Sequence, residues 1–77
     1  MKSTKYTPNA ITAIRVKKGY TIDAIATLLS VSSAQVENWE NGSVVPSSVH
    51  LLQLCAVLET SVELLYPEEY KKLMSRE

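Results

Sequence analysis

Hydrophobic positions recur every three or four residues along most of the chain, the spacing that puts side chains on one face of an α-helix. This spacing predicts an inward stripe in each of four segments, made of Ile11 and Ile14, then Ile22, Ile25, Ala26 and Leu29, then Val36 and Trp39, and then Leu51, Leu54, Cys55 and Leu58. A shorter stripe follows at Val62 and Leu65. There is no alternating strand pattern and no internal repeat. The pattern therefore predicts five or six short helices and no sheet.

Residues that start and stop helices stand between these stripes. Thr7-Pro8 predicts the start of the first helix, because a capping hydroxyl precedes a proline whose missing N–H costs nothing in a first turn. Gly19 predicts a left-handed end to that helix, and Asn41-Gly42 ends the third. Four further helices are expected to begin after a hydroxyl residue that can accept a backbone hydrogen bond, at Thr21, Ser32, Ser47 or Ser48, and Ser61.

A very short turn joins the second and third expected helices. Each of these helices is about eight residues long, and Ser30-Val31-Ser32 separates them. Such a pair is typical of a helix-turn-helix, in which the second helix lies in the DNA major groove. Any small helical bundle contains a helix pair, so this spacing alone leaves the function open.

The ordered residues around this pair carry a more specific resemblance. Arg15 stands late in the first helix before Lys18-Gly19, Ile25-Ala26 follows, and the third helix ends as Val36-Glu37-Asn38-Trp39-Glu40-Asn41-Gly42. Pro46 and the leucine-rich fourth helix follow in step. Over about residues 8–66 the chain resembles the lambda-repressor-like (Cro/C1-type, XRE) helix-turn-helix family. The resemblance implies an all-α, five-helix lambda-repressor-like bundle with a short C-terminal helical extension.

Three parts of the chain are expected on this basis. Residues 1–7 form an N-terminal basic arm, residues 8–66 the helix-turn-helix domain, and residues 67–77 the extension. The arm carries Lys2 and Lys5, which either grip the DNA backbone or belong to an ordinary solubilising terminus.

The extension has its own helical pattern. Pro67 interrupts the chain, and Glu68-Glu69 suit the first turn of a final segment that reaches about Met74. Tyr70, Leu73 and Met74 form one apolar stripe, which either folds back on the core or pairs with a second subunit.

The resemblance assigns base-reading positions to Ser33, Ala34 and Asn38. Asn38 can pair bidentately with adenine, Ser33 can bond to several bases, and Ala34 can touch a thymine methyl group. If Val36 faces the core, Glu37 lies on the exposed face with them, where it accepts a hydrogen bond from cytosine N4 or is simply a solvated charge.

Other residues are expected to position the domain on DNA. Asn41 matches a phosphate-contacting position, and the full set of expected phosphate contacts is Lys17, Lys18, Thr21, Ser32, Asn41 and Ser43. Arg15 and Glu40 match a pair that forms a salt bridge between the first helix and the end of the third.

Several positions depart from the family pattern. Ile22 stands where relatives often have a phosphate-binding Gln, and Ser30 and Glu59 replace glycines, which predicts left-handed backbone at both residues. The loop after the third helix, often basic in relatives, reads Ser43-Val44-Val45. Two exposed valines suit a protein partner better than phosphate.

The net charge is zero, but the charges are unevenly distributed. Residues 1–20 carry basic side chains and no acid, whereas residues 21–70 carry acids and no Lys or Arg. Since DNA-binding proteins draw affinity from Lys and Arg on phosphates, this distribution weakens the case for tight binding by a monomer.

Other classes of function are disfavoured. No nucleophile–base pair, glycine-rich phosphate loop or ligand cluster occurs, so neither an enzyme nor a cofactor is expected. His50 and Cys55 are five residues apart, the wrong spacing for a shared metal. No apolar run reaches the ~20 residues of a membrane span, and the single cysteine gives no internal disulfide, which favours a cytoplasmic protein.

The helix pattern and the resemblance together predict a sequence-specific DNA-binding regulator of transcription, and the resemblance implies a repressor related to phages or other mobile elements. It would act as a homodimer on double-stranded DNA, with the third helix (about 33–41) in the major groove. The alternative is a protein-interaction module, antirepressor-like or a partner of another regulatory protein, that uses this helix and the 43–45 loop.

Overall fold

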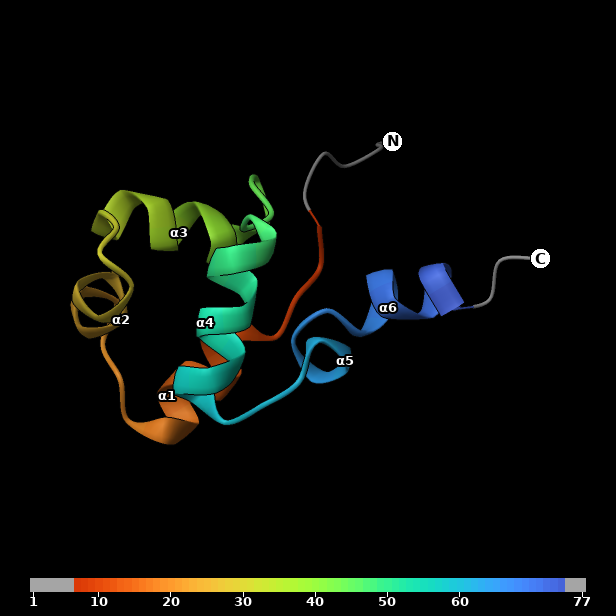
Figure 1. Ribbon diagram of the computed structural model, residues 1–77, viewed down its shortest axis with the longest axis horizontal. Helices are drawn as coiled ribbons and strands as arrows, with labels where there is room; N and C mark the ends of the chain where they lie inside the picture. The colour runs from red at the N-terminus through yellow and green to blue at the C-terminus, as the bar shows by residue number, and fades with distance from the viewer. Residues whose placement is uncertain (1–6, 75–77) are drawn as a thin grey trace.

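The computed structural model describes residues 7–74, which form six helices and no strand (Figure 1). Lys2 and Lys5 of the expected arm lie outside the described residues. The helices are α1 (Ile11–Lys18), α2 (Ile22–Leu29), α3 (Ser33–Asn41), α4 (Ser48–Leu58), α5 (Val62–Leu65) and α6 (Pro67–Met74). The predicted all-α fold is confirmed, with α6 as the C-terminal extension. None of these helices is long and apolar enough to cross a membrane.

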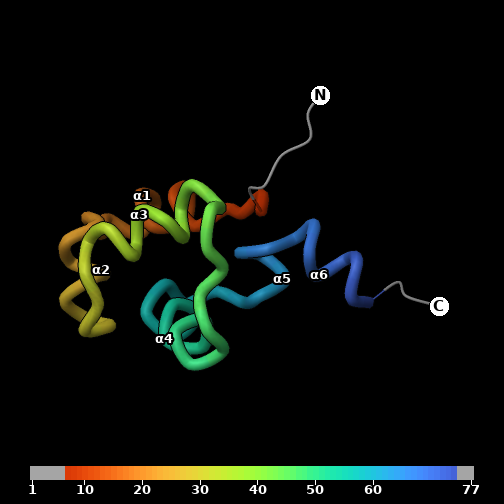
Figure 2. The backbone as a smooth tube through the Cα atoms, turned by 90° about the horizontal axis from the view of Figure 1, so that it is seen from above, coloured from red at the N-terminus to blue at the C-terminus, as the bar shows by residue number. Residues whose placement is uncertain are grey.

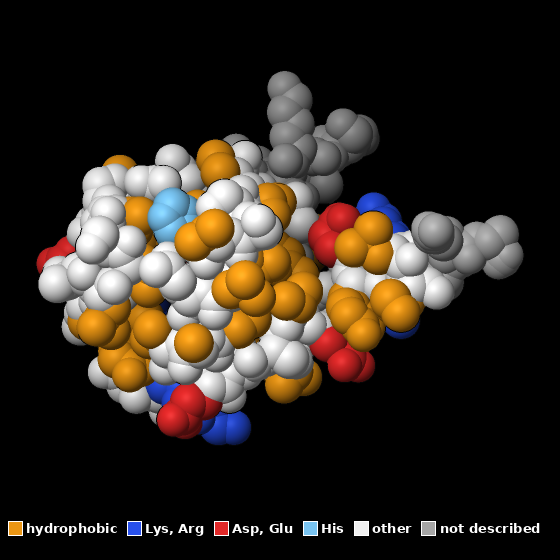
Figure 3. Space-filling model, viewed as in Figure 1, with side chains coloured by type: hydrophobic (Ala, Val, Ile, Leu, Met, Phe, Trp, Pro, Cys, Tyr) orange, Lys and Arg blue, Asp and Glu red, His pale blue; other side chains and the backbone are white. Residues whose placement is uncertain are grey.

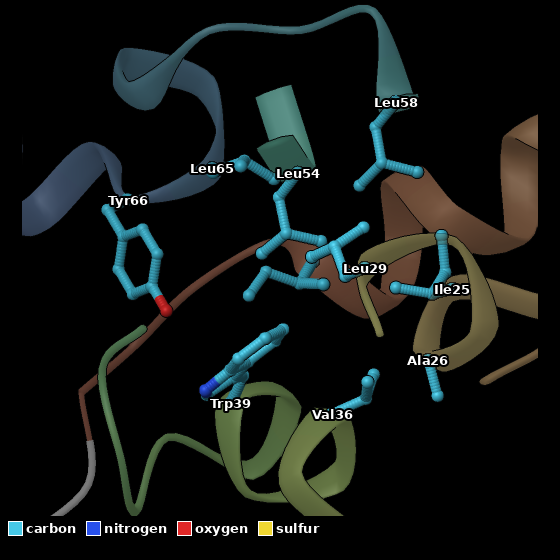
Figure 4. Packing of buried hydrophobic residues seen from close by; sticks show 10 residues of the cluster. Ile25, Ala26, Leu29, Val36, Trp39, Leu54, Leu58, Leu65 and Tyr66 are labelled. Carbon is cyan, nitrogen blue, oxygen red and sulfur yellow. The ribbon is translucent and has the colours of Figure 1, made fainter. Parts of the chain in front are cut away.

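The predicted inward stripes build one core. Figure 4 shows Trp39 and Val36 of α3 pointing into the space that they share with Leu54 of α4 and Leu29 of α2. The buried set consists of Ile11, Ile25, Ala26, Leu29, Val36, Trp39, Leu54, Leu58, Leu65 and Tyr66. Cys55 is half-buried at its margin, and burial raises the pKa of this thiol, so it stays protonated at neutral pH.

The expected start of α1 at Thr7-Pro8 is wrong. The helix begins at Ile11, and residues 7–10, called here the N-terminal segment, have no helical structure. Their backbone is engaged elsewhere, since the Thr7 N–H donates to the carbonyl oxygen of Gly42 (2.8 Å) and the Ala10 N–H donates to that of Leu65 (2.8 Å). The side chain of Asn9 accepts the Ile11 N–H at 3.0 Å and so takes the place of a capping Thr7.

Two helices end on residues that stand where the resemblance implies glycines. Ser30 has φ 59° after α2 and Glu59 has φ 53° after α4, as their positions predict. A side chain in this left-handed region is crowded by the backbone, whereas glycine is not.

Replacing Ser30 by glycine should therefore stabilise the domain by about 0.5–1 kcal/mol, since relief of crowding outweighs the added freedom of the unfolded chain. As a control, Ser48→Gly in the first turn of α4 should cost up to about 1 kcal/mol, because its backbone is already helical. Urea denaturation of both variants measures the two changes. A loss of stability in Ser30→Gly would contradict the expectation.

Helix α6 projects from one end of the molecule. Figures 1 and 2 both show it extending away from α1–α4, next to α5. None of its residues is buried. The apolar stripe of the extension (Tyr70, Leu73 and Met74) is therefore not buried in the core of its own chain, which was one of the two alternatives for this helix.

Candidate nucleic-acid interface

The turn between α2 and α3 is short and firmly bonded. Ser30 takes the left-handed conformation, and the Val31 N–H donates to the carbonyl oxygen of Ala26 at 2.9 Å. Val31 is half-buried against the core. Because the turn itself packs on the core, the angle between the two helices is set by the fold rather than left to a loose linker.

The inner face of α3 is fixed by packing. Val36 and Trp39 are 0% and 1% exposed. The centre of the Trp39 ring lies 5.3 Å from the centre of the His50 ring on α4, and the two ring planes are tilted by 42°. Trp39 is thus part of the core, which removes it from the residues that could stack on a base.

The C-terminal end of α3 is held by the N-terminal segment. The side-chain nitrogen of Asn9 (Nδ2) donates to the carbonyl oxygens of Trp39 (3.0 Å) and Glu40 (3.3 Å), which are two of the last carbonyls of the helix. The Trp39 carbonyl also accepts the N–H of Gly42 at 3.2 Å. Gly42 follows with φ 86° and lies directly against the backbone of Thr7. Sequence reasoning missed Asn9, because nothing local connects it with carbonyls some thirty residues away.

A second bond to α1 fixes the same end of α3. The Arg15 Nε donates to Glu40 Oε2 at 2.5 Å, its Nη2 donates to Oε1, and its Nη1 donates to the carbonyl oxygen of Tyr20. Thr12, which the sequence did not single out, donates its hydroxyl to Glu40 Oε1 at 2.8 Å. The Arg15 and Glu40 side chains are only 13% and 9% exposed, so the pair is a nearly buried brace between α1 and α3.

The outer face of α3 is open and polar. Ala34, Glu37, Asn38 and Asn41 are all exposed on the side away from Val36 and Trp39. Ser33 differs, because it is half-buried and its hydroxyl donates to the carboxylate of Asp23 on α2. Four of the five singled-out positions on α3 can therefore touch a ligand directly, whereas Ser33 must first leave Asp23.

The contact between Ser33 and Asp23 brings the N-termini of α2 and α3 together. Each helix starts with a hydroxyl cap, since Thr21 accepts the Ala24 N–H and Ser32 accepts the Gln35 N–H. Helix N-termini attract anions through their free N–H groups and the positive end of the helix dipole. Asp23 opposes that attraction with its own negative charge.

The loop after α3 is ordered by bonds back to the helix. Asn41 Oδ1 accepts the Ser43 N–H at 2.8 Å, and the carbonyl oxygen of Asn38 accepts the Val44 N–H at 3.2 Å. The two valines of this loop are 46% (Val44) and 50% (Val45) exposed. The loop thus presents apolar side chains next to the polar outer face of α3.

The lysines expected to bind phosphate lie elsewhere. Lys18 forms an ion pair with Glu59 at 3.1 Å, and Lys17 and Lys18 border a shallow depression with Leu58 and Leu64, at the C-terminal ends of α1 and α4. Figure 1 shows the end of α1 at the bottom of the view and α3 at the top. Thr21 and Ser32 lie at the N-termini of α2 and α3, and Asn41 and Ser43 lie at the C-terminal end of α3. The two lysines lie at neither place.

A comparison with protein families gives one decisive match. The helix-turn-helix family model matches residues 11–65 of this chain. The chain belongs to the Cro/C1-type helix-turn-helix family. The matched range runs from the first residue of α1 to the last residue of α5, so the helix-turn-helix match ends just before α6.

A solved structure supports the fold of this helix-turn-helix chain. This chain is similar to the crystal structure of the hypothetical transcription factor NHTF from Neisseria. The TM-score is 0.63 and the sequence identity is 24%, over 86% of this chain and 76% of that chain. At this identity the likeness bears on the fold. A comparison with curated proteins finds no match.

Proposed function

We propose that this helix-turn-helix protein is a sequence-specific DNA-binding regulator of transcription that acts in the cytoplasm as a homodimeric repressor of a phage or another mobile element. The observation that supports this proposal is that α3 is held rigidly and presents a polar face to solvent. Its inner face is buried, its end is braced by Asn9 and Arg15, and its outer face carries exposed side chains suited to base edges. In a dimer, two such helices would enter successive major grooves ~34 Å apart.

Four residues of α3 have a proposed role in reading base edges. Asn38 pairs with adenine, Ala34 contacts a thymine methyl group, and Glu37 accepts from cytosine N4. Ser33 joins them if its hydroxyl exchanges Asp23 for a base.

Phosphates are contacted mainly by neutral groups in this proposal. The N-termini of α2 and α3 with Thr21 and Ser32 bind one phosphate group, and Asn41 and Ser43 bind another beyond the end of α3. Lys17 and Lys18 act through the long-range field rather than by contact, because they lie at the far end of α1.

Binding to random-sequence duplex DNA, measured by fluorescence anisotropy, tests the proposal. Affinity should be measurable at low salt and should fall as salt rises. Asp23→Asn should tighten binding about fivefold, because it removes one negative charge beside the phosphate-facing helix ends. Glu63→Gln on α5 is the matched control, since it removes an exposed acid away from this surface and should change binding little.

Base reading is tested separately on a selected DNA site. Asn38→Ala should leave random-sequence binding unchanged but cost about 1–3 kcal/mol on the selected site. If the wild-type chain does not bind DNA at low salt and high protein concentration, the proposed function is wrong.

The exposed valines favour one alternative, a protein-interaction module that binds another regulatory protein through α3 and the 43–45 loop. Val44 and Val45 are both about half exposed, and no Lys or Arg occurs between residues 21 and 70. Under this alternative, replacing Val44 by serine weakens binding of the partner, while the wild type shows no salt-dependent affinity for DNA. Unchanged DNA affinity in the Val44→Ser variant supports the DNA-binding proposal.

A further inference from the structure

An open apolar groove of about 220 Å³ lies between α6 and the rest of the domain. Its lining includes Val45, Leu51, Val62, Tyr66, Tyr70 and Leu73. Figure 3 shows hydrophobic side chains on the facing sides of the main body and of the projecting C-terminal helix. A groove of this composition would be filled by apolar side chains rather than by a charged ligand.

Helix α6 forms one wall of the groove without being buried itself. Leu73 and Met74 are 68% and 66% exposed, and no residue of the helix is buried. A helix of eight residues is marginal in water unless its apolar face packs against something. The same helix therefore supplies both a wall of the groove and the exposed side chains that could fill one.

The charges of α6 indicate what lies beside it. Glu68 and Glu69 occupy its first turn, and Lys71 and Lys72 its last. A second α6 lying antiparallel would place its basic last turn beside the acidic first turn of the other helix. The two helix dipoles would then point in opposite directions, which is the attractive arrangement for helices side by side. Glu69 and Lys72 are on the same flank of the apolar stripe, where they form an i,i+3 pair at 3.7 Å, so an antiparallel copy meets opposite charges on that flank.

We propose that the partner in this groove is a second copy of the chain, whose α6 lies antiparallel to the first so that each copy inserts Leu73 and Met74 into the groove of the other. Such an arrangement is self-complementary about a two-fold axis. This inference deepens the proposed dimeric regulator and rests on that proposal only for the expectation of a dimer.

Sedimentation of the full chain without DNA tests the apolar part of the interface. The wild type should dimerise, and Leu73→Glu should raise the dissociation constant of the dimer about 30-fold, since it puts a charge into the apolar groove. Leu28→Glu is the control, because Leu28 is also an exposed leucine (55%) but lies on α2, at the other end of the molecule. It should leave dimerisation unchanged, and circular dichroism should show that both variants stay folded.

A charge exchange tests the antiparallel arrangement. Glu69→Lys and Lys72→Glu should each weaken their own homodimer about fivefold, because like charges then face each other across the interface. Mixing the two variants should restore dimers, since every cross-chain pair becomes attractive while each helix keeps its own like-charged pair. Energy transfer between labelled variants measures this heterodimer.

A wild type that stays monomeric at millimolar concentration overturns the inference, as does a dimer that Leu73→Glu leaves intact or a mixture that forms no heterodimer. Salt-dependent DNA binding by a monomeric wild type would leave the proposed DNA function standing while this interface fails. A dimer that has no affinity for DNA would do the reverse.

Discussion

Replacing Gly42 by alanine is expected to destabilise the domain by about 2–5 kcal/mol. Two effects add at this position. Gly42 has φ 86°, where an L side chain is crowded, and a Cβ atom there would lie 2.5 Å from the carbonyl oxygen of Thr7 and 2.8 Å from its nitrogen. Both of those are backbone atoms, and the Thr7 N–H is itself bonded to Gly42, so the N-terminal segment would have to move away from the end of α3.

Gly19 provides a control that separates the two effects. Its φ of 87° is nearly the same, but a Cβ atom there would meet nothing within 4 Å. Gly19→Ala should therefore cost only the backbone term, about 1 kcal/mol. Urea unfolding followed by the fluorescence of Trp39, the only tryptophan, measures both variants. Equal losses would show that the contact between Gly42 and Thr7 contributes nothing.

Glu40→Ala is expected to cost about 3–5 kcal/mol, because it leaves the charge of Arg15 nearly buried without its partner. The same substitution removes the acceptor of the Thr12 hydroxyl bond. Arg15→Ala should be similarly severe, and the double variant should cost clearly less than the sum of the two, since neither charge is then left alone. Denaturant unfolding of the three variants gives this coupling directly.

The exposed ion pair of the same chain is the comparison for Glu40. Lys18 is bonded to Glu59, but their side chains are 37% and 76% exposed, so solvent screens the attraction. Lys18→Ala should change stability by about 0.5 kcal/mol or less. A Glu40→Ala variant no less stable than Lys18→Ala would mean that the brace between α1 and α3 is not needed for the fold.

The sequence predicted the features that depend on neighbours along the chain. The caps at Thr21, Ser32 and Ser61 each accept a backbone N–H three residues later, as their positions indicate. The sequence left Ser47 and Ser48 open for α4, and the structure has Ser47 as the cap. The inward stripes follow from the same kind of local rule, whereas the left-handed ends at Ser30 and Glu59 were expected because the resemblance places glycines at these two positions.

The start of α1 shows where local rules fail. Thr7 and Pro8 carry an adequate local pattern for a helix start, yet the backbone of this segment bonds to Gly42 and Leu65 instead. Asn9 caps two helices at once, since its side chain accepts from the start of α1 and donates to the end of α3. The bonds from this segment to Gly42, Leu65 and the end of α3 could not be predicted, because each joins residues thirty or more positions apart.

The candidate site divides in the same way. The spacing of Val36 and Trp39 determined which side of α3 faces outward, because a helix of known register has only one apolar face. The tertiary structure alone decided that Ser33 is bonded to Asp23, that Lys18 is paired with Glu59 away from α3, and that α6 leaves an apolar groove open. Helical periodicity is a property of a few consecutive residues, whereas the neighbours of a side chain depend on how whole helices pack, and that packing is the reason these features appeared only in three dimensions.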